Sequence, residues 1–198
     1  MTRALLVIDV QNDFCPGGAL AVAGGSDIVP GINALMTEFD AVILTQDWHP
    51  AGHYSFASSH PGAAPMSVTD MPYGPQVLWP DHCIQGTEGG EFHADLKVTA
   101  ANLVIRKGYN PDIDSYSAFF ENDKTTATGL EGYLRNRGLS DLTMVGLATD
   151  FCVNYSAVDA AKLGFNVTVR QDLCRAIDFD GSLSAAQSGM QAAGVTLL

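Results

Sequence analysis

The sequence has little positive charge: 10 of its 198 residues are Lys or Arg, against 22 Asp or Glu, which gives a formal net charge of −12. Surfaces that bind nucleic acid need clustered Lys and Arg to neutralise phosphates, so we expect no nucleic-acid partner. Charged residues are also few, at 16%, whereas 46% of the residues are hydrophobic. This composition excludes a disordered polymer, and the length favours one domain.

The sequence also lacks segments that direct a chain to a membrane or out of the cell. It has no apolar run of about 18 residues, the length that spans a bilayer. The apolar run at residues 4–8 is too short for a signal peptide. The four cysteines, at positions 15, 83, 152 and 174, form no Cys-x-x-Cys pair. We therefore expect a cytoplasmic protein with reduced thiols, one of which is available as a nucleophile.

Short, uniformly apolar segments alternate with helical patterns along the chain. The apolar segments cover residues 5–10, 41–44, 103–105, 142–147, 167–169 and 195–198, and the helical patterns cover residues 28–39, 130–138, 153–163 and 182–193. Strands that are apolar on both faces and alternate with helices are typical of a parallel sheet between helical layers. We predict a single α/β domain, a three-layer sandwich around a six-stranded, mostly parallel sheet.

Residues 48–100 interrupt this alternation. Six of the nine prolines fall in this segment, which shows no sustained periodicity but contains core-type side chains such as Trp48, Phe56 and Trp79. A loop this long in a compact domain is uncommon and is usually functional. We therefore expect it to contribute to a site.

Polar residues follow the predicted strands at their carboxyl ends. In chain order these residues are Asp9, then Asp47 and His49, then Lys107, Cys152 and Asp172. Each one alone is more often a helix cap or a turn residue. The carboxyl ends of parallel strands lie along one edge of the sheet, where ligands bind at the reversal of strand order, so the set together predicts a site.

Cys152 lies where a strand turns into a helix, the layout of a nucleophile elbow. The helix N-terminus there would favour a thiolate and bind an oxyanion, although a lone cysteine is as often a buried structural residue. No histidine lies near any predicted strand end other than the second, which argues against a Cys–His pair, so Asp9 is the candidate base and Lys107 its cationic partner. A purely structural Asp–Lys ion pair is the alternative.

Asp47 and His49 stand two residues apart at a strand end, so both side chains can reach one metal ion. A third ligand is required. His82 is the best candidate, and His53, His60 and His93 are weaker ones. Oxygen and nitrogen donors of this kind suit Zn²⁺, Fe²⁺ or Mn²⁺.

Six motifs together give the chain a family resemblance: LVIDVQNDF at residues 6–14, TQDWHP at 45–50, WPDHC at 79–83, RKG at 106–108, DSYSAF at 114–119 and GLATDFCV at 146–153. They resemble the nicotinamidase/pyrazinamidase family of isochorismatase-like hydrolases nearly from end to end. The resemblance implies one isochorismatase-like hydrolase domain over residues 1–198, with a metal-bearing active-site loop at about 48–100. It further implies hydrolysis of nicotinamide, and also of pyrazinamide, in NAD salvage.

The resemblance also implies a role for each candidate residue. Cys152 would attack the carboxamide carbon to form a thioester, Asp9 would carry the proton to departing ammonia, and Lys107 would orient the charged pair. Backbone N–H groups of Ala148 and Cys152 would form the oxyanion hole, next to a cis peptide bond between Leu147 and Ala148.

For the ligands, the resemblance implies one divalent ion, with zinc ahead of iron and manganese, held by Asp47, His49 and His82. His53 is a candidate fourth ligand because some relatives use a further histidine near the first pair. The aromatic pocket would consist of Phe14, Trp79 and Tyr116. The expected partner is a small-molecule amide, and the expected assembly is a monomer or a small homo-oligomer.

Two alternatives remain open. The protein could be another amidase or hydrolase of the superfamily, such as an isochorismatase or a carbamoylsarcosine or ureidoacrylate amidase, although the Asp47, His49 and His82 set points away from these. It could also be a non-catalytic binding member whose thiol is structural.

Overall fold

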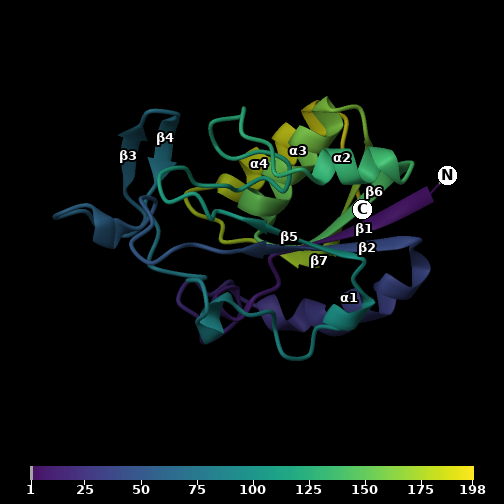
Figure 1. The fold of residues 1–198 in the computed structure, drawn as a ribbon, viewed down its shortest axis with the longest axis horizontal. Coiled ribbons are helices and arrows are strands. Elements are labelled where there is room, and N and C mark those ends of the chain that lie inside the picture. Colours follow the sequence, from purple (N-terminus) through teal and green to yellow (C-terminus); the bar gives the residue numbers. More distant parts are fainter. Residues whose placement is uncertain (1) are drawn as a thin grey trace.

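The computed structural model describes residues 2–198, and a six-stranded sheet forms its centre (Figure 1). The strand order is β5-β2-β1-β6-β7-β8, and neighbouring strands pair in parallel. The strands of this sheet are β1 (Thr2–Ile8), β2 (Ala41–Asp47), β5 (Leu103–Lys107), β6 (Leu139–Leu147), β7 (Asn166–Arg175) and β8 (Thr196–Leu197). The predicted α/β class and six-stranded sheet are confirmed, and β7 is longer than its apolar run.

Helices cover both faces of the sheet. They are α1 (Val29–Leu35), α2 (Leu130–Asn136), α3 (Asn154–Lys162) and α4 (Ser182–Ala192). Helix α1 lies on one face, and α2, α3 and α4 lie on the other (Figure 1). Because side chains alternate along a strand, Leu5 and Val7 of β1 pack in the core on the α1 side, while Leu6 and Ile8 pack in the core on the opposite side. This double burial explains why β1 is uniformly apolar.

The strand order reverses between β1 and β6. From β1 the chain continues to β2 and β5 on one side, and it later returns to β6, β7 and β8 on the other. At this reversal Ile8 pairs with Gly146, and a Cβ on Gly146 would lie 2.1 Å from the Ile8 carbonyl oxygen. Glycine is therefore required there, and it brings the carboxyl ends of β1 and β6 together.

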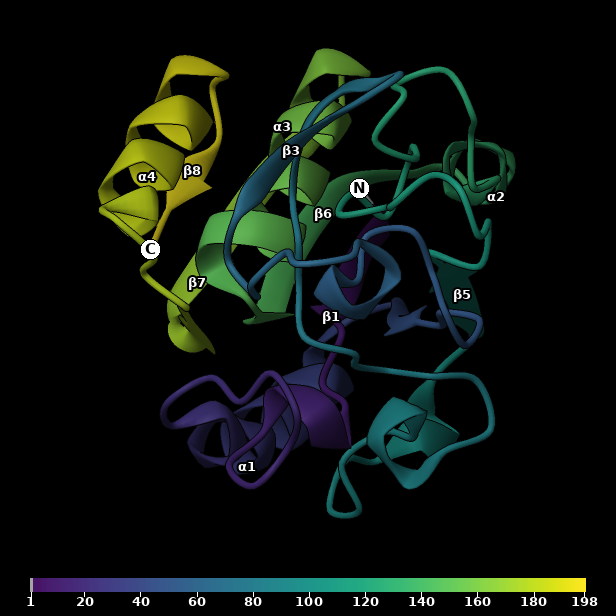
Figure 2. The same cartoon turned by 90° about the vertical axis from the view of Figure 1, so that its left-hand side faces the viewer.

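The long segment between β2 and β5 contains a small antiparallel hairpin, β3 (Val68–Met71) with β4 (Gly74–Val77). Its four-residue strands are too short and too polar for a recognisable pattern. Figures 1 and 2 place this hairpin at the carboxyl end of the central sheet. Single bridges pair His49 with Ile84 and Phe56 with Trp79. The segment is therefore ordered and packs beside the carboxyl end of the sheet.

None of the helices within residues 2–198 combines the length and the apolar character that crossing a membrane requires.

Candidate active site

Lys107, the last residue of β5, is the centre of a buried charge cluster. Its Nζ lies 2.8 Å from Asp9 Oδ2, 3.1 Å from Asp47 Oδ1 and 3.5 Å from Cys152 Sγ, and it donates to the Ser115 carbonyl oxygen at 2.9 Å. The side chains of Lys107 and Asp9 are fully buried. The structure thus brings together the three residues of the predicted triad, each from a different strand end.

Asp9 follows β1 with a positive φ of 47°, and Thr45 fixes its carboxylate. The Asp9 N–H donates to Thr45 Oγ1 at 3.1 Å, and the Thr45 hydroxyl donates to Asp9 Oδ1 at 2.6 Å. Burial raises the pKa of Asp9, although the neighbouring Lys107 ammonium opposes this rise. A carboxylate whose pKa is raised accepts a proton more readily than an exposed one.

Cys152 lies in a π-helical turn, Thr149–Val153, between β6 and α3. The peptide bond between Leu147 and Ala148, just before this turn, is cis, as the resemblance implied. Burial raises the pKa of the Cys152 thiol well above its usual value, more than Lys107 lowers it. Burial therefore opposes the thiolate that the helix N-terminus is expected to favour.

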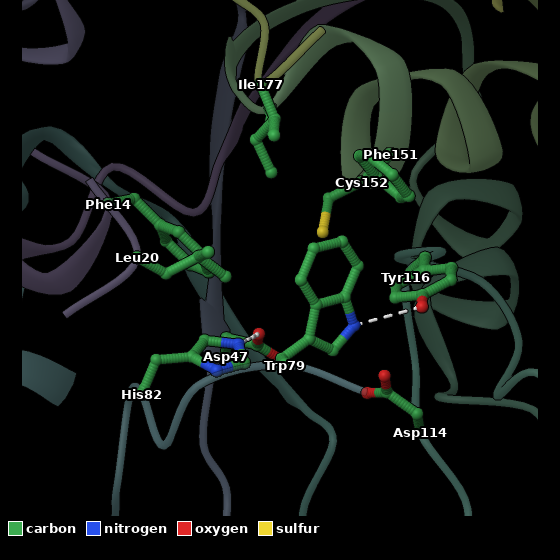
Figure 3. A pocket seen from close by; sticks show the side chains of 11 residues that line it. Phe14, Leu20, Asp47, Trp79, His82, Asp114, Tyr116, Phe151, Cys152 and Ile177 are labelled. Atoms are coloured by element: carbon green, nitrogen blue, oxygen red, sulfur yellow. Dashed lines mark hydrogen bonds and ion pairs between the residues drawn. The ribbon is translucent and has the colours of Figure 1, made fainter. Parts of the chain in front are cut away.

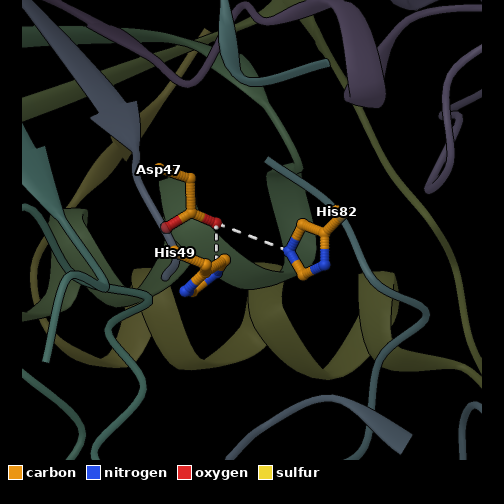
Figure 4. A group of neighbouring side chains, drawn as sticks. All are labelled: Asp47, His49 and His82. Carbon is orange, nitrogen blue, oxygen red and sulfur yellow. Dashed lines mark hydrogen bonds and ion pairs between the residues drawn. The ribbon is translucent and has the colours of Figure 1, made fainter. Parts of the chain in front are cut away.

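Asp47, His49 and His82 converge beside this triad (Figure 4). Asp47 Oδ2 lies 3.2 Å from His49 Nε2 and 3.5 Å from His82 Nε2, and the three ligand atoms lie within 4.8 Å of one another. All three residues are buried. Although burial opposes it, the charges of His49 and Lys107 hold the pKa of Asp47 well below its usual range.

The surroundings of the two histidines fit a metal site. His49 Nδ1 lies 2.8 Å from the Gly108 carbonyl oxygen, and His82 Nδ1 lies 2.8 Å from that of Pro80. A carbonyl can only accept, so each Nδ1 donates to it, and each Nε2 faces the Asp47 carboxylate and is the atom that a metal ion would bind. Outer partners of this kind orient metal-binding imidazoles. The group is therefore a candidate divalent-metal centre.

The other histidines lie outside this group. Both ring nitrogens of His53 have partners, with Nδ1 2.8 Å from Ser55 Oγ and Nε2 2.7 Å from the Asn110 carbonyl oxygen. His60 bonds the Tyr54 carbonyl oxygen. His93 lies against Ser26. In this structure both ring nitrogens of His53 therefore have other partners, and His53 lies outside the Asp47, His49 and His82 group.

A small cavity connects the triad with the metal group (Figure 3), with an empty volume of about 310 Å³. The three aromatic residues predicted for the pocket, Phe14, Trp79 and Tyr116, line this cavity. Trp79 Nε1 donates to the Tyr116 hydroxyl at 3.0 Å. The lining is mostly apolar with a few polar groups at one end, as in sites that bind small molecules.

The sequence did not point to four further lining residues: Leu20, Asp114, Phe151 and Ile177. Phe151 and Asp114 belong to quoted motifs, so their position in those motifs was an available signal. Leu20 and Ile177 are apolar residues of irregular segments and carry no signal of this kind.

One predicted residue is wrong. Asp172 was expected at the carboxyl end of its strand, but β7 continues past it to Arg175. Its side chain is 58% exposed and forms an ion pair with Arg170 at 2.8 Å. Asp172 therefore lies away from the cavity.

Comparison with known proteins gives a family match over nearly the whole chain. The isochorismatase domain model matches residues 3–198. The nicotinamidase of Acinetobacter baylyi is 56% identical over 192 residues, which cover 97% of this chain and 90% of the relative.

Solved structures agree with this match. A nicotinamidase/pyrazinamidase of Acinetobacter baumanii has a TM-score of 0.98 at 54% identity, covering 100% of this chain and 95% of the other. PnC1 of L. infantum in complex with nicotinate has a TM-score of 0.87 at 42% identity, with coverages of 100% and 92%. The pyrazinamidase of Pyrococcus horikoshii in complex with zinc has a TM-score of 0.80 at 34% identity, with coverages of 100% and 99%.

Proposed function

The chain belongs to the isochorismatase family, and we propose that it is a nicotinamidase, an amidohydrolase that converts nicotinamide to nicotinate and ammonia in NAD salvage. One observation carries this proposal: Cys152, from the cluster with Asp9 and Lys107, lines the same cavity as Asp47 and His82 of the metal-type group. An amide carbon and a ring nitrogen of one small molecule can reach both groups at once. Pyrazinamide, which has the same carboxamide on a diazine ring, is a second substrate.

In the first half-reaction Cys152 Sγ attacks the carboxamide carbon, and its proton passes to the Asp9 carboxylate. The tetrahedral intermediate collapses as the C–N bond breaks, and Asp9 gives this proton to the leaving amine, which departs as ammonia. Lys107 holds the Asp9 carboxylate in place at 2.8 Å and compensates its charge.

In the second half-reaction a water molecule attacks the thioester carbon and gives a proton to Asp9. The C–S bond breaks, Asp9 returns the proton to Cys152 Sγ, and nicotinic acid leaves and loses its own proton to solvent as nicotinate. In both half-reactions the negative charge on the carbonyl oxygen is stabilised by the backbone N–H groups of Ala148 and Cys152. The cis peptide bond before Ala148 belongs to the turn that would present these groups.

Asp47, His49 and His82 would hold one divalent ion, with Zn²⁺ as the first choice because the related pyrazinamidase structure contains zinc. Fe²⁺ and Mn²⁺ are also compatible with this donor set. When bound, the ion supplies a Lewis acid that accepts the lone pair of a pyridine nitrogen. Phe14, Trp79 and Tyr116 enclose the ring, and the ring's position places the carboxamide near Cys152.

The charge cluster argues against a non-catalytic binding protein. A buried Lys with two buried carboxylates costs free energy in desolvation, and a protein that only bound a ligand would not need a thiol 3.5 Å from that Lys. The metal-type group favours a substrate that has a ring nitrogen over the substrates of other superfamily amidases. We further propose a cytoplasmic monomer or small homo-oligomer that has no nucleic-acid or membrane partner.

The test is the formation of ammonia and nicotinate from nicotinamide, with benzamide as the matched substrate in which carbon replaces the ring nitrogen. We expect nicotinamide to be hydrolysed and benzamide to be slower by up to about 10⁴-fold, because sites built for a polar group reject analogues that lack it. Equal rates on the two amides would show that the Asp47, His49 and His82 group does not select the ring. No ammonia from either amide would contradict the proposed function.

A further inference from the structure

Asp150 lies two residues before the nucleophile, and the mechanism above does not use it. Its carboxylate is 3% exposed and accepts three hydrogen bonds from the segment between β7 and α4. The donors are the N–H of Ile177 at 3.1 Å, the N–H of Asp178 at 2.8 Å and the hydroxyl of Ser182 at 2.5 Å. Ser182 is the first residue of α4, so a single buried carboxylate joins both the segment after β7 and the start of α4 to the turn that carries the nucleophile.

This segment contributes one side chain to the cavity, that of Ile177. Figure 3 shows Ile177 across the cavity from Asp47 and His82, with Cys152 between them. The residues that follow Ile177, numbers 178–180, are exposed. Ile177 itself is partly buried against the core, and the Asp150 carboxylate fixes its backbone N–H.

We propose that Asp150 is a positioning residue that sets the ring specificity of the pocket. By holding the N–H of Ile177, it keeps this side chain against the ring edge that lies opposite the metal group. The orientation of the ring rests on the proposed function, in which the pyridine nitrogen faces Asp47, His49 and His82. Ile177 then faces the far ring edge, and substituents on that edge are excluded.

Replacement of Asp150 by Asn is a sharp perturbation because the two side chains have nearly the same shape. A carboxylate accepts on both oxygens, whereas an amide accepts on one side and donates on the other. In Asp150→Asn the amide NH₂ therefore faces either the Ile177 N–H or the donors of Asp178 and Ser182. Two donors cannot pair, so the segment must move and Ile177 must move with it.

The diagnostic substrate is 5-methylnicotinamide. Its methyl group lies on the ring edge away from the nitrogen, and it is not adjacent to the carboxamide, so the amide torsion is unchanged. The quantity to measure is kcat/KM for 5-methylnicotinamide divided by kcat/KM for nicotinamide. We expect Asp150→Asn and Ile177→Ala each to raise this ratio about tenfold, the lower range for one methyl group in an apolar pocket.

The double variant separates positioning from a general loss of structure. If Asp150 acts through Ile177, Asp150→Asn adds nothing to the ratio once Ile177 is Ala, because residues that act through one contact are not additive. The matched control is Asp180→Asn, which removes a charge from an exposed position of the same segment. This control leaves the ratio unchanged. An equal loss on both substrates in Asp150→Asn, or full additivity in the double variant, overturns the proposal.

Ser182→Ala removes one of the three donors and should raise the ratio by less than Asp150→Asn does. If Asp150→Asn does not fold, Ser182→Ala decides the outcome: an unchanged ratio then overturns the proposal.

A second readout does not require amidase activity. Cys152 is alkylated with iodoacetamide or with the bulkier N-phenylmaleimide, and peptide mapping gives the rate at this cysteine. Asp150→Asn should raise the maleimide rate relative to the iodoacetamide rate, and Asp180→Asn should not. If the wild type does not hydrolyse nicotinamide but this relative rate changes, the proposed function fails while the role of Asp150 stands. The reverse result refutes only the role of Asp150.

Discussion

Lys107 is the residue on which the other charges of the site depend. Its ammonium lies within 3.1 Å of both Asp9 and Asp47, and none of these side chains is more than 5% exposed. Lys107→Met keeps the chain length but leaves two carboxylates buried together. We expect turnover to fall by at least about 100-fold, the low end for positioned acid–base groups. Unfolding free energy should fall by about 3–5 kcal/mol.

The measurements for Lys107→Met are steady-state ammonia release and denaturant unfolding. Lys97→Met is the matched control, because Lys97 is exposed, and it should behave as the wild type. If the turnover of Lys107→Met stays within a few-fold of the wild-type value, the role of Lys107 is only structural.

The protonation state of Cys152 gives a prediction about pH. Burial raises the pKa of this thiol well above its usual value, more than Lys107 lowers it. Only the thiolate reacts with iodoacetamide, and its fraction rises about tenfold per pH unit below the pKa. In the substrate-free enzyme the alkylation rate at Cys152 should therefore still be rising at pH 9. A plateau below pH 7, measured by peptide mapping, would indicate a stabilised thiolate.

At the scale of elements, the end of β5 limits the room around the metal group. Gly108 has a φ of +66°, and a Cβ there would lie 2.5 Å from His49 Cε1 and 2.9 Å from Asp47 Oδ1. Gly138 has the same φ, but nothing lies within 4 Å of its Cβ position. The two glycines therefore form a matched pair that differs only in what an added methyl group meets.

Gly108→Ala should lower metal affinity by about 10- to 100-fold, as outer-shell changes do, because it displaces the two ligands it touches. Gly138→Ala should bind the metal with normal affinity. Its unfolding free energy should fall by about 1 kcal/mol, because alanine is strained in the left-handed backbone conformation. Titration with a competing chelator measures both affinities. Equal affinities in the two variants would mean that the end of β5 does not shape the metal site.

The central strands could be predicted from sequence because both of their faces are buried. Leu5 and Leu6 enter different cores, so β1 appears as one apolar run. The predicted triad meets Asp47 and His49 in space because parallel strands place their carboxyl ends at one edge, whereas His82 reaches this edge from the long segment between β2 and β5. That prediction needs only the strand ends, and no side-chain detail.

Other features depend on packing that local sequence does not encode. Ile177 lines the cavity, and its backbone N–H donates to Asp150, which is 27 residues away in the chain. Asp172 resembled a residue at a strand end, but β7 continues beyond it. The burial that raises the pKa of the Cys152 thiol arises from the folded surroundings, which no local pattern reveals.

At the scale of the whole molecule, a metal ion would connect the end of β2 to the segment that carries His82. Only the folded chain brings these ligands together, so the ion stabilises the native state. At a free concentration about 100-fold above its Kd, the ion adds about 2.7 kcal/mol. For a chain of this size, each kcal/mol corresponds to about 2–4 °C in Tm.

Chelation should therefore lower the Tm of the metal-loaded protein by about 5–10 °C, as measured by differential scanning calorimetry. His49→Ala should melt at the same temperature with and without chelator. His60→Ala should keep the full shift, because His60 lies outside the metal group. An identical Tm for wild type before and after metal removal would contradict a metal that is bound only by the folded protein.

The proposed mechanism requires that Cys152 forms a thioester with the substrate acyl group. Mass spectrometry of enzyme quenched with acid during nicotinamide turnover detects this thioester directly. We predict a nicotinoyl adduct on the peptide that contains Cys152, and no adduct on Cys15, Cys83 or Cys174. Cys152→Ala should show no adduct and release no ammonia. Continued ammonia release by Cys152→Ala, or an adduct on another cysteine, would contradict the account.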